Sequence, residues 1–274
     1  MTTPRLCTPD DREKVLEYVS AEPEMAVFIT GDIEQFGMTD PVSVYAFERA
    51  DGSWDGIVCK FFANFVCYAR ESHFDAETMA GLIREQVGER FLGSVNGKYE
   101  TVVALAPYLS ELDMRTLNLA GLTEVAHDQI APAPDGTTIR VLGEDDYDEL
   151  FALLGSMDEY RGLYDDERSV AMAKKQRAAD AEHGCITYGA FYEGELVSTA
   201  ATSAASSSSA MVVSVGTRND CRGFGLATAV VAKLCTDAVA DGKQFLALFY
   251  DNPSAGRIYG RIGFHKCGRY AMLR

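Results

Sequence analysis

The most informative segment of this sequence is Met211-Val-Val-Ser-Val-Gly-Thr-Arg-Asn-Asp-Cys-Arg-Gly-Phe-Gly-Leu-Ala-Thr-Ala-Val-Val231. Its first seven residues are rich in β-branched side chains and predict a strand over 211–217. A short polar loop follows, and Arg222-Gly-Phe-Gly-Leu-Ala227 opens a helix that is predicted to stop at Gly242. The first-turn N–H groups of a helix lack intrahelical acceptors, glycines let a phosphate approach the backbone, and an arginine adds positive charge. The segment is therefore predicted to cradle a pyrophosphate.

Other phosphate-binding segments fit this stretch less well. The dinucleotide-binding pattern G-x-G-x-x-G is met at Gly223 and Gly225 but fails at Thr228. Only 46 residues follow Thr228, too few to complete a doubly wound sheet, which disfavours a nucleotide-binding oxidoreductase. A Walker loop would need Gly-Lys-Ser/Thr, which is absent. A glycine-rich turn that only joins a strand to a helix is the alternative that these residues leave open.

A second informative segment follows the predicted cradle and its helix. Residues 245–250 are apolar and predict a buried strand. Asn252 is a good N-cap, and Pro253 suits the first position of a helix that is predicted to run to Gly263. A last strand is predicted near 265–273.

Together the two segments resemble the GNAT superfamily of acyl-CoA N-acyltransferases. The central family motif, Arg/Gln-x-x-Gly-x-Gly/Ala, is matched by Arg222, Gly225 and Ala227. The next family motif is matched in order and spacing by Asn252, Ala255, Tyr259, Gly263 and Phe264. The motifs cover about 211–264, and the order of predicted elements extends the resemblance over 138–274.

The resemblance implies a GNAT N-acetyltransferase that uses acetyl-CoA as its acyl-donor substrate, with a primary amine as acceptor. Val215 and Thr217 would hold pantetheine and the thioester through their backbone, and Asn252 would contact the pantetheine side. Tyr259 would face the sulfur as the catalytic residue and protonate the leaving thiolate. For Asn252 a helix cap, and for Tyr259 a packed core position, are the plainer interpretations. The residues implied for the pyrophosphate are Arg222, Gly223, Phe224, Gly225, Leu226, Ala227 and Thr228.

The chain is predicted to contain two domains. Ile130-Ala-Pro-Ala-Pro-Asp-Gly136 is a polar, proline-rich segment that predicts a linker. Residues 5–16 align with 140–151 at a constant offset of 135, which suggests two repeats of about 135 residues. We therefore predict a degenerate GNAT-like domain without a cofactor motif at 1–130, a linker at 131–136 and a catalytic GNAT domain at 137–274. The identities of the alignment are Arg5/Arg140, Asp10/Asp145 and Asp11/Asp146.

The first half lacks the phosphate cradle. Where the cradle would fall, the sequence has Glu71-Ser-His-Phe-Asp-Ala76, and its two acids would repel a phosphate. Strands are predicted near 43–48, 56–61 and 64–69, and helices near 75–88 and 98–109. The expected fold class is α/β of mixed α+β character, with two tandem GNAT-like domains. Each would be a mixed, mostly antiparallel sheet flanked by helices, and the first would shape the acceptor site or an oligomer.

Composition and charge limit the class of protein. The chain has 274 residues, 47% of them hydrophobic, and a net charge of −16 that argues against a nucleic-acid binder. Residues 218–274 nevertheless carry nine basic and four acidic side chains, which favours a compact anionic ligand. No run of 18 apolar residues and no apolar leader are present, so we expect a cytoplasmic protein without a membrane partner. Seven scattered cysteines without a CxxC pair suit reduced thiols.

The acceptor side is less well defined. Residues 144–167 carry ten acids against the single base Arg161, which forms either an acidic wall for a cationic amine or a solvated helix face. Asp158 and Glu159 are candidates for contacts with the acceptor. The four histidines show no ligand spacing, so no metal is expected. We expect a small-molecule or peptide amine as acceptor and a possible homodimer. A second hypothesis is an idle acyl-CoA-binding sensor or regulatory protein.

Overall fold

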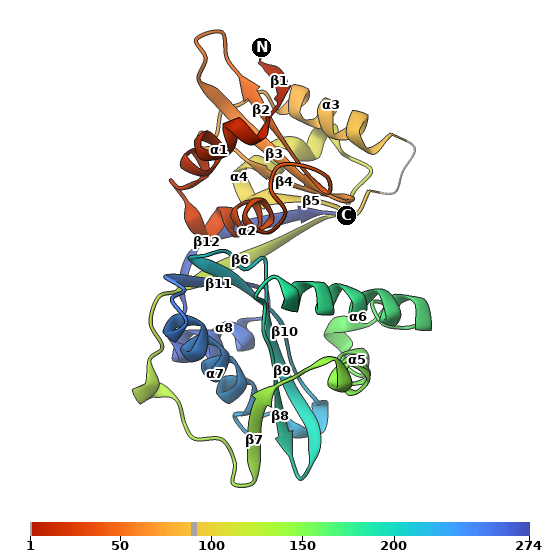
Figure 1. Ribbon diagram of the computed structural model, residues 1–274, viewed down its shortest axis with the longest axis vertical. Coiled ribbons are helices and arrows are strands. Elements are labelled where there is room, and N and C mark those ends of the chain that lie inside the picture. The colour runs from red at the N-terminus through yellow and green to blue at the C-terminus, as the bar shows by residue number, and fades with distance from the viewer. Residues whose placement is uncertain (1, 89–91) are drawn as a thin grey trace. The chain divides into compact units, whose positions relative to one another are not determined.

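The computed structural model describes residues 2–88 and 92–274, and it divides into two compact units (Figure 1). Unit 1 comprises residues 1–119, 249–251 and 266–274, and unit 2 comprises 120–248 and 252–265. The predicted domain at 1–130 includes residues 1 and 89–91, which lie outside the described ranges. Within those ranges, no helix is both long and apolar enough to cross a bilayer.

Unit 1 is a mixed, mostly antiparallel sheet with the strand order β1-β2-β3-β4-β5-β12-β6. Pairing is antiparallel from β1 to β4, parallel between β4 and β5, and antiparallel between β5 and β12. Apolar side chains of α3 and α4, such as Met79, Ile83 and Leu105, pack with Phe65 and Val95 of the sheet in one core. The bounds are β1 Thr3–Leu6, α1 Arg12–Val19, α2 Val27–Phe36, β2 Val42–Glu48, β3 Trp54–Phe61, β4 Asn64–Tyr68, α3 Ala76–Val87, β5 Ser94–Lys98, α4 Tyr99–Leu105, β6 Met114–Leu122 and β12 His265–Leu273.

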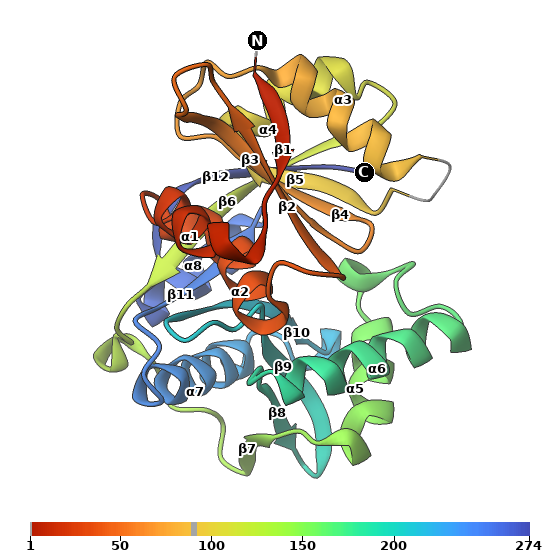
Figure 2. The same ribbon diagram turned by 45° about the horizontal axis from the view of Figure 1, so that its top comes forward.

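Unit 2 has the strand order β11-β10-β9-β8-β7, parallel between β10 and β11 and antiparallel elsewhere. Figures 1 and 2 show α5 and α6 on one face of this sheet and α7 and α8 on the other. Between α5 and the sheet lies a core that contains Leu150, Leu154, Met157 and Leu196. The bounds are β7 Thr137–Val141, α5 Tyr147–Gly155, the 3-10 turn η6 Asp158–Tyr160, α6 Glu167–Glu182, β8 Thr187–Tyr192, β9 Glu195–Ser203, β10 Ser209–Thr217, η7 Asn219–Cys221, α7 Leu226–Ala240, β11 Phe245–Tyr250 and α8 Pro253–Ile262.

The repeat inferred from residues 5–16 and 140–151 is present in three dimensions. In unit 1, Arg5 donates from both Nη atoms to Asp11 at 2.9 Å, and the same carboxylate accepts from the N–H of Thr8. In unit 2, Arg140 makes the same pair of bonds to Asp146, at 2.8 and 2.6 Å, and that carboxylate accepts from the N–H of Gly143. The arginine from the first strand thus fixes the start of the first helix in both units.

The division differs from the predicted linker at 131–136. Unit 2 begins at Ala120, and the final strand β12 belongs to unit 1, where Tyr270 is opposite Lys98 of β5. A strand pairs with whichever sheet edge it meets in space, and that partner is not encoded in local sequence. The predicted fold class, mixed α/β with mostly antiparallel strand pairing and flanking helices, is confirmed.

Candidate active site

The predicted pyrophosphate cradle is the N-terminus of α7. The helix begins at Leu226, and its N-cap is Gly225, which has a φ of 84° and no side chain to cap the first turn. Gly223 has a φ of 87°, and a Cβ added at either glycine would meet open space. Glycine adopts this left-handed conformation without the steric cost other residues incur. The first-turn N–H groups of Leu226, Ala227 and Thr228 therefore lack intrahelical acceptors and a capping side chain, an arrangement suited to an anion.

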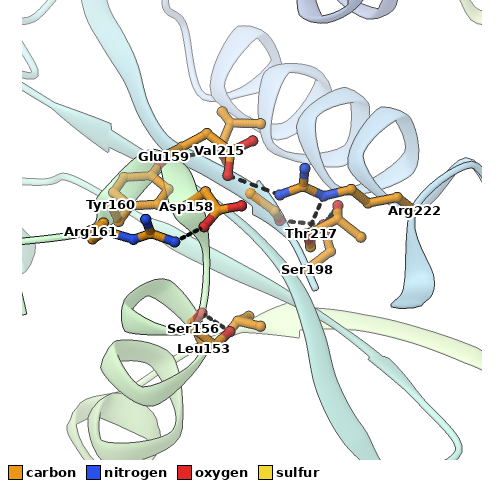
Figure 3. Close-up of polar contacts among 11 residues, drawn as sticks. Leu153, Ser156, Asp158, Glu159, Tyr160, Arg161, Ser198, Val215, Thr217 and Arg222 are labelled. Carbon is orange, nitrogen blue, oxygen red and sulfur yellow. Dashed lines mark hydrogen bonds and ion pairs between the residues drawn. The ribbon is translucent and has the colours of Figure 1, made fainter. Parts of the chain in front are cut away.

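Arg222 and Phe224 flank these glycines differently. Phe224 is 62% exposed. Arg222 donates from Nη2 to Glu159 Oε2 at 2.9 Å and from Nε to the carbonyl of Thr217 at 3.1 Å (Figure 3). Burial would raise the pKa of Glu159, but the hydrogen bond from Arg222, a hydrogen bond from its own backbone and the charge of Arg222 together hold the pKa below its usual value. Glu159 is thus an ionised partner of the arginine assigned to the pyrophosphate, and a phosphate would compete with it.

Strand β10 leaves its neighbour β11 beside the cradle. The two strands pair in parallel only from Ser209 to Val212. Beyond that, the register of β10 with β9 shifts between Val213 and Gly216, and Ser214 has a φ of 51°. Such a bulge bends a strand away from its neighbour. The predicted donor contacts Val215 and Thr217 both lie in this diverging segment.

Side chains from three elements contact the diverging segment. The hydroxyl of Tyr160 in η6 donates to the carbonyl of Val215 at 3.1 Å (Figure 3). The hydroxyl of Ser198 donates to the carbonyl of Gly216 at 2.8 Å. A Cβ at Gly216 would lie 2.4 Å from the sulfur of Met157, so a larger residue there would displace the end of the methionine side chain. The backbone predicted to hold the donor is therefore covered by η6 and the residue preceding it.

Tyr259 and Asn252 lie in and before α8. The side chain of Asn252 accepts the N–H of Ser254 at 2.8 Å, so it caps the helix. Tyr259 is buried and packs edge-on against Phe264, with ring centroids 5.9 Å apart. Burial raises the pKa of Tyr259 to about 12, and it also raises the pKa of Tyr160, to which Tyr259 adds a further increase. The two hydroxyls are therefore close enough to interact electrostatically, which places Tyr259 near the diverging strand.

The structure thus brings the predicted residues of β10 and α7 together, and it adds residues that sequence reasoning missed. Tyr160, Arg177 and Ser214 all lie at the diverging strand, where Arg177 Nη2 donates to Ser214 Oγ at 2.8 Å. The available signal was the position of Arg177 in α6, seven residues after Val170 and four after Ala173, both of which pack on the core. Among residues 2–88 and 92–274, no cluster of three or more His, Cys, Asp or Glu side chains could hold a metal.

Comparison with known proteins agrees with this geometry. The family model described as GNAT acetyltransferase matches residues 176–273. A tandem GNAT protein from the clavulanic acid biosynthesis pathway is 14% identical, with a TM-score of 0.60 over 100% of this chain and 98% of that chain. A GCN5-related N-acetyltransferase from Sphaerobacter thermophilus is 18% identical, with a TM-score of 0.64 over 99% of this chain and 94% of that one.

A GCN5-related N-acetyltransferase from Kribbella flavida is 21% identical, with a TM-score of 0.57 over 80% of this chain and 86% of that one. No curated protein matches the sequence. At these identities the solved structures establish the fold, and the family model carries the assignment of the second half. Residues 176–273 therefore match the GNAT acetyltransferase family, and the chain shares the fold of GNAT N-acetyltransferases, including that of a tandem GNAT protein.

Proposed function

We propose that the chain is an acyltransferase that moves an acetyl or other small acyl group from acyl-CoA to a primary amine. The observation that carries this proposal is the glycine-capped N-terminus of α7 beside the diverging end of β10. Open space at Gly223 and Gly225, uncapped N–H groups and a nearby arginine fit a pyrophosphate, and a diverging strand fits the arm that leads to the thioester.

The residues around this strand have separate tasks in the proposed reaction. The donor supplies the acyl carbon, to which the amine nitrogen bonds as the carbon–sulfur bond breaks; the amine loses a proton and the sulfur gains one. Tyr259, protonated at neutral pH because burial raises its pKa to about 12, can donate its hydroxyl hydrogen toward the sulfur. Backbone N–H groups of the diverging strand can stabilise negative charge on the thioester oxygen.

Arg222 must change partners for the proposed reaction. It is bound to Glu159, and both side chains are about half exposed, so their ion pair is weak and a pyrophosphate can replace it. Its release would free Glu159 next to the diverging strand. Glu159 is then the acid best placed to accept the amine proton, directly or through water.

Two measurements on the full-length protein test the proposal. Calorimetric titration should show CoA and acetyl-CoA binding, and a screen of amino acids, polyamines, aminoglycosides and peptide N-termini should show acyl transfer by release of free thiol. Absence of CoA binding would refute the proposal. Binding without turnover on the whole panel would favour the alternative, an acyl-CoA sensor. The cytoplasmic location, the homodimer and the absence of nucleic-acid, membrane and metal partners stay predictions.

A further inference from the structure

Arg177 is a buried cation that the proposed transfer does not use. It lies on α6 and donates from Nη2 to Ser214 Oγ at 2.8 Å. Its Nε and Nη1 are buried and have no hydrogen-bond partner among the residues that the structure describes. Arg177 is also absent from the ion pairs found among the described residues of unit 2. Three N–H donors of one guanidinium are therefore buried and unused.

The surroundings of Arg177 do not neutralise it. Burial raises the pKa of Tyr147, Tyr160 and Tyr164, and the nearby charge of Arg177 opposes that rise in each case. Asp180 is one helical turn away, and the charge of Arg177 lowers its pKa, but burial raises that pKa by more. The carboxylate accepts from Gln176 at 2.8 Å, and Nε and Nη1 of Arg177 make no hydrogen bond to it. Buried N–H donors of a charged group that lack acceptors are costly, and an anionic ligand would remove that cost.

We propose that Arg177 binds a carboxylate of the acceptor, so that the acceptor is a small amino carboxylate. This inference rests on the proposed acyl transfer and identifies the substrate class of the same site. Arginine is the side chain best matched to carboxylate oxygens, because its planar fork offers parallel N–H donors. The bond from Arg177 ends on Ser214, the residue directly before Val215 in β10.

The position of Arg177 also limits the length of the acceptor. Successive strand residues are about 3.3 Å apart, so a carboxylate bound beside Ser214 lies within about one or two residue spacings of the predicted thioester site at Val215. An amine separated from its carboxylate by one to a few carbons spans that distance. A decarboxylated amine of the same size would leave the guanidinium unpaired.

Access to Arg177 depends on η6. Its residue Tyr160 lies within electrostatic reach of the guanidinium and donates to the carbonyl of Val215. The neighbouring Glu159 pairs with Arg222. The donor is proposed to bind the backbone at Val215 and the side chain of Arg222, which are the partners of these two η6 side chains. Donor binding would therefore weaken the contacts that hold η6 in place. We therefore expect the acceptor to bind after the donor.

The decisive experiment compares amino acids with their amides and decarboxylated amines as acceptors of the full chain. Wild-type kcat/KM should favour the carboxylate form by about 100-fold or more, since a site built to pair a polar group rejects analogues that lack it. Arg177→Met should lose most of this preference, and Arg177→Lys should retain part of it. Lys174→Met, one turn away and paired with exposed Asp148, removes the same charge and should keep the preference. Equal use of acids and amides by the wild type would overturn the inference.

A binding experiment covers the case in which no acceptor turns over. N-acetylated amino acids and their methyl amides are titrated into the CoA-loaded protein, and CoA binding itself is measured first. The acids alone should bind, and Arg177→Met should abolish that binding while CoA affinity is retained. Equal affinity of acid and amide, or no binding of either with CoA bound, would refute the carboxylate site; loss of CoA binding by the wild type would instead refute the proposed function. The melting temperature of Arg177→Met should stay level or rise, whereas a structural arginine would make it fall.

Discussion

Helices α3 and α7 each connect the two parallel strands of their unit, but their N-termini are capped by different kinds of residue. In unit 1, Asp75 caps α3, and its carboxylate accepts from the N–H of Thr78 at 3.1 Å and from the N–H of Thr2 at 3.1 Å. In unit 2, the corresponding residue is Gly225, which has no side chain. An acidic cap supplies internally the negative charge that an anionic ligand would otherwise bring. The same topology therefore ends in an open helix N-terminus, the predicted phosphate cradle, in one unit and in a closed helix end in the other.

A second difference lies in the helix after the parallel strand. The seventh residue of α8 is Tyr259, and the seventh residue of α4 is Leu105. Leu105 is fully buried in the core of unit 1, whereas Tyr259 carries a hydroxyl at the same helical position. The counterparts in unit 1 of the proposed anion site and the proposed proton donor are thus an acidic cap and a leucine. Its retained features are those that hold the fold, such as the Arg5–Asp11 pair.

The largest effect is expected on kcat when the hydroxyl of Tyr259, which Leu105 of unit 1 does not have, is removed. Tyr259→Phe keeps the ring on Phe264 and should lower kcat roughly 10- to 1,000-fold, with little change in melting temperature or acyl-CoA affinity. A phenol with a pKa of about 12 is a much weaker acid than an ordinary thiol near 8.5, so it stabilises the thiolate by hydrogen bonding more than by full proton transfer. This favours the lower part of the range.

Tyr270→Phe in unit 1 is the matched control. Its hydroxyl donates to Asn96 Oδ1 at 2.7 Å in a fully buried site, so its loss should lower stability and leave kcat unchanged. Single-turnover kinetics separate chemistry from product release. Wild-type kcat in Tyr259→Phe, with chemistry rate-limiting, would make Tyr259 a packing residue.

The next largest effect is expected on CoA affinity when the N-cap of α7 is made acidic like that of α3. Gly225→Asp places a carboxylate at the N-cap of α7, as Asp75 does in α3, and should weaken CoA binding about tenfold or more, or about 1.4 kcal/mol. Gly225→Ala is the control, because it shares the cost of a side chain at a φ of 84° without the charge. Calorimetric titration should rank the affinities wild type, alanine, aspartate. Glu71→Gln in unit 1 should leave CoA binding unaltered, and an unchanged affinity in Gly225→Asp would remove the cradle from the mechanism.

Sequence reasoning succeeded where local pattern determines structure. The strand at 245–250 and the last strand at 265–273 were predicted with their observed bounds, and α7 begins at Leu226, within the segment 222–227 that was predicted to open it. Glycine and cap residues carry this information, because φ and hydrogen-bond needs are local. In unit 1, α2, β5 and β6 were missed. Within β5, Asn96 and Gly97 do not favour a strand.

The missed parts of the site depend on long-range packing. Ser214 bonds Arg177 across 37 residues of sequence, and Tyr160 bonds Val215 across 55. Neither pair carries a motif, because each exists only where the bulge of β10 meets α6 and η6. Glu159 was predicted as an acceptor contact, and in the structure it pairs with Arg222 of the cradle. One acid of the stretch at 144–167 therefore contacts the arginine that is predicted to bind the pyrophosphate.

A smaller effect is expected at the closed helix end. Asp75→Ala removes the cap of α3 and should lower stability by about 1 kcal/mol, whereas Asp75→Asn should lose less because asparagine also caps well. Burial alone would raise the pKa of Asp75, but hydrogen bonds from Thr2 and Thr78 outweigh it and lower the pKa. The ionised cap therefore stabilises the fold above the unfolded pKa of about 3.9, and its contribution is lost as pH falls through the folded pKa.

Thermal melts of the two variants at pH 7 and pH 3 measure this contribution. The gap in melting temperature between the wild type and Asp75→Asn should narrow at the lower pH. A gap of the same size at both values would show that the charge of Asp75 does not matter to α3. CoA affinity should be the same in all three proteins, since the closed end has no ligand.

The smallest effect concerns Glu159, the carboxylate that pairs with the arginine of the predicted cradle. Glu159 pairs with Arg222 at 2.9 Å, so in the ligand-free protein it holds the arginine away from a phosphate as an internal competitor, much as Asp75 occupies α3. Glu159→Gln should free Arg222 and tighten CoA binding about two- to fivefold, because a half-exposed ion pair is worth less than about 1 kcal/mol. Asp158→Asn is the matched control: it removes the same charge one residue earlier, from a carboxylate that pairs with exposed Arg161. Equal tightening in both variants would show a general effect of reduced negative charge, and tightening in Glu159→Gln alone would show direct competition.

The difference in CoA affinity between Glu159→Gln and the wild type should shrink as salt is raised from about 50 to about 500 mM, since screening weakens the ion pair and the phosphate contact together. If Glu159 also accepts the amine proton, the same variant should bind CoA more tightly and yet turn over more slowly, a combination that loss of competition alone cannot produce.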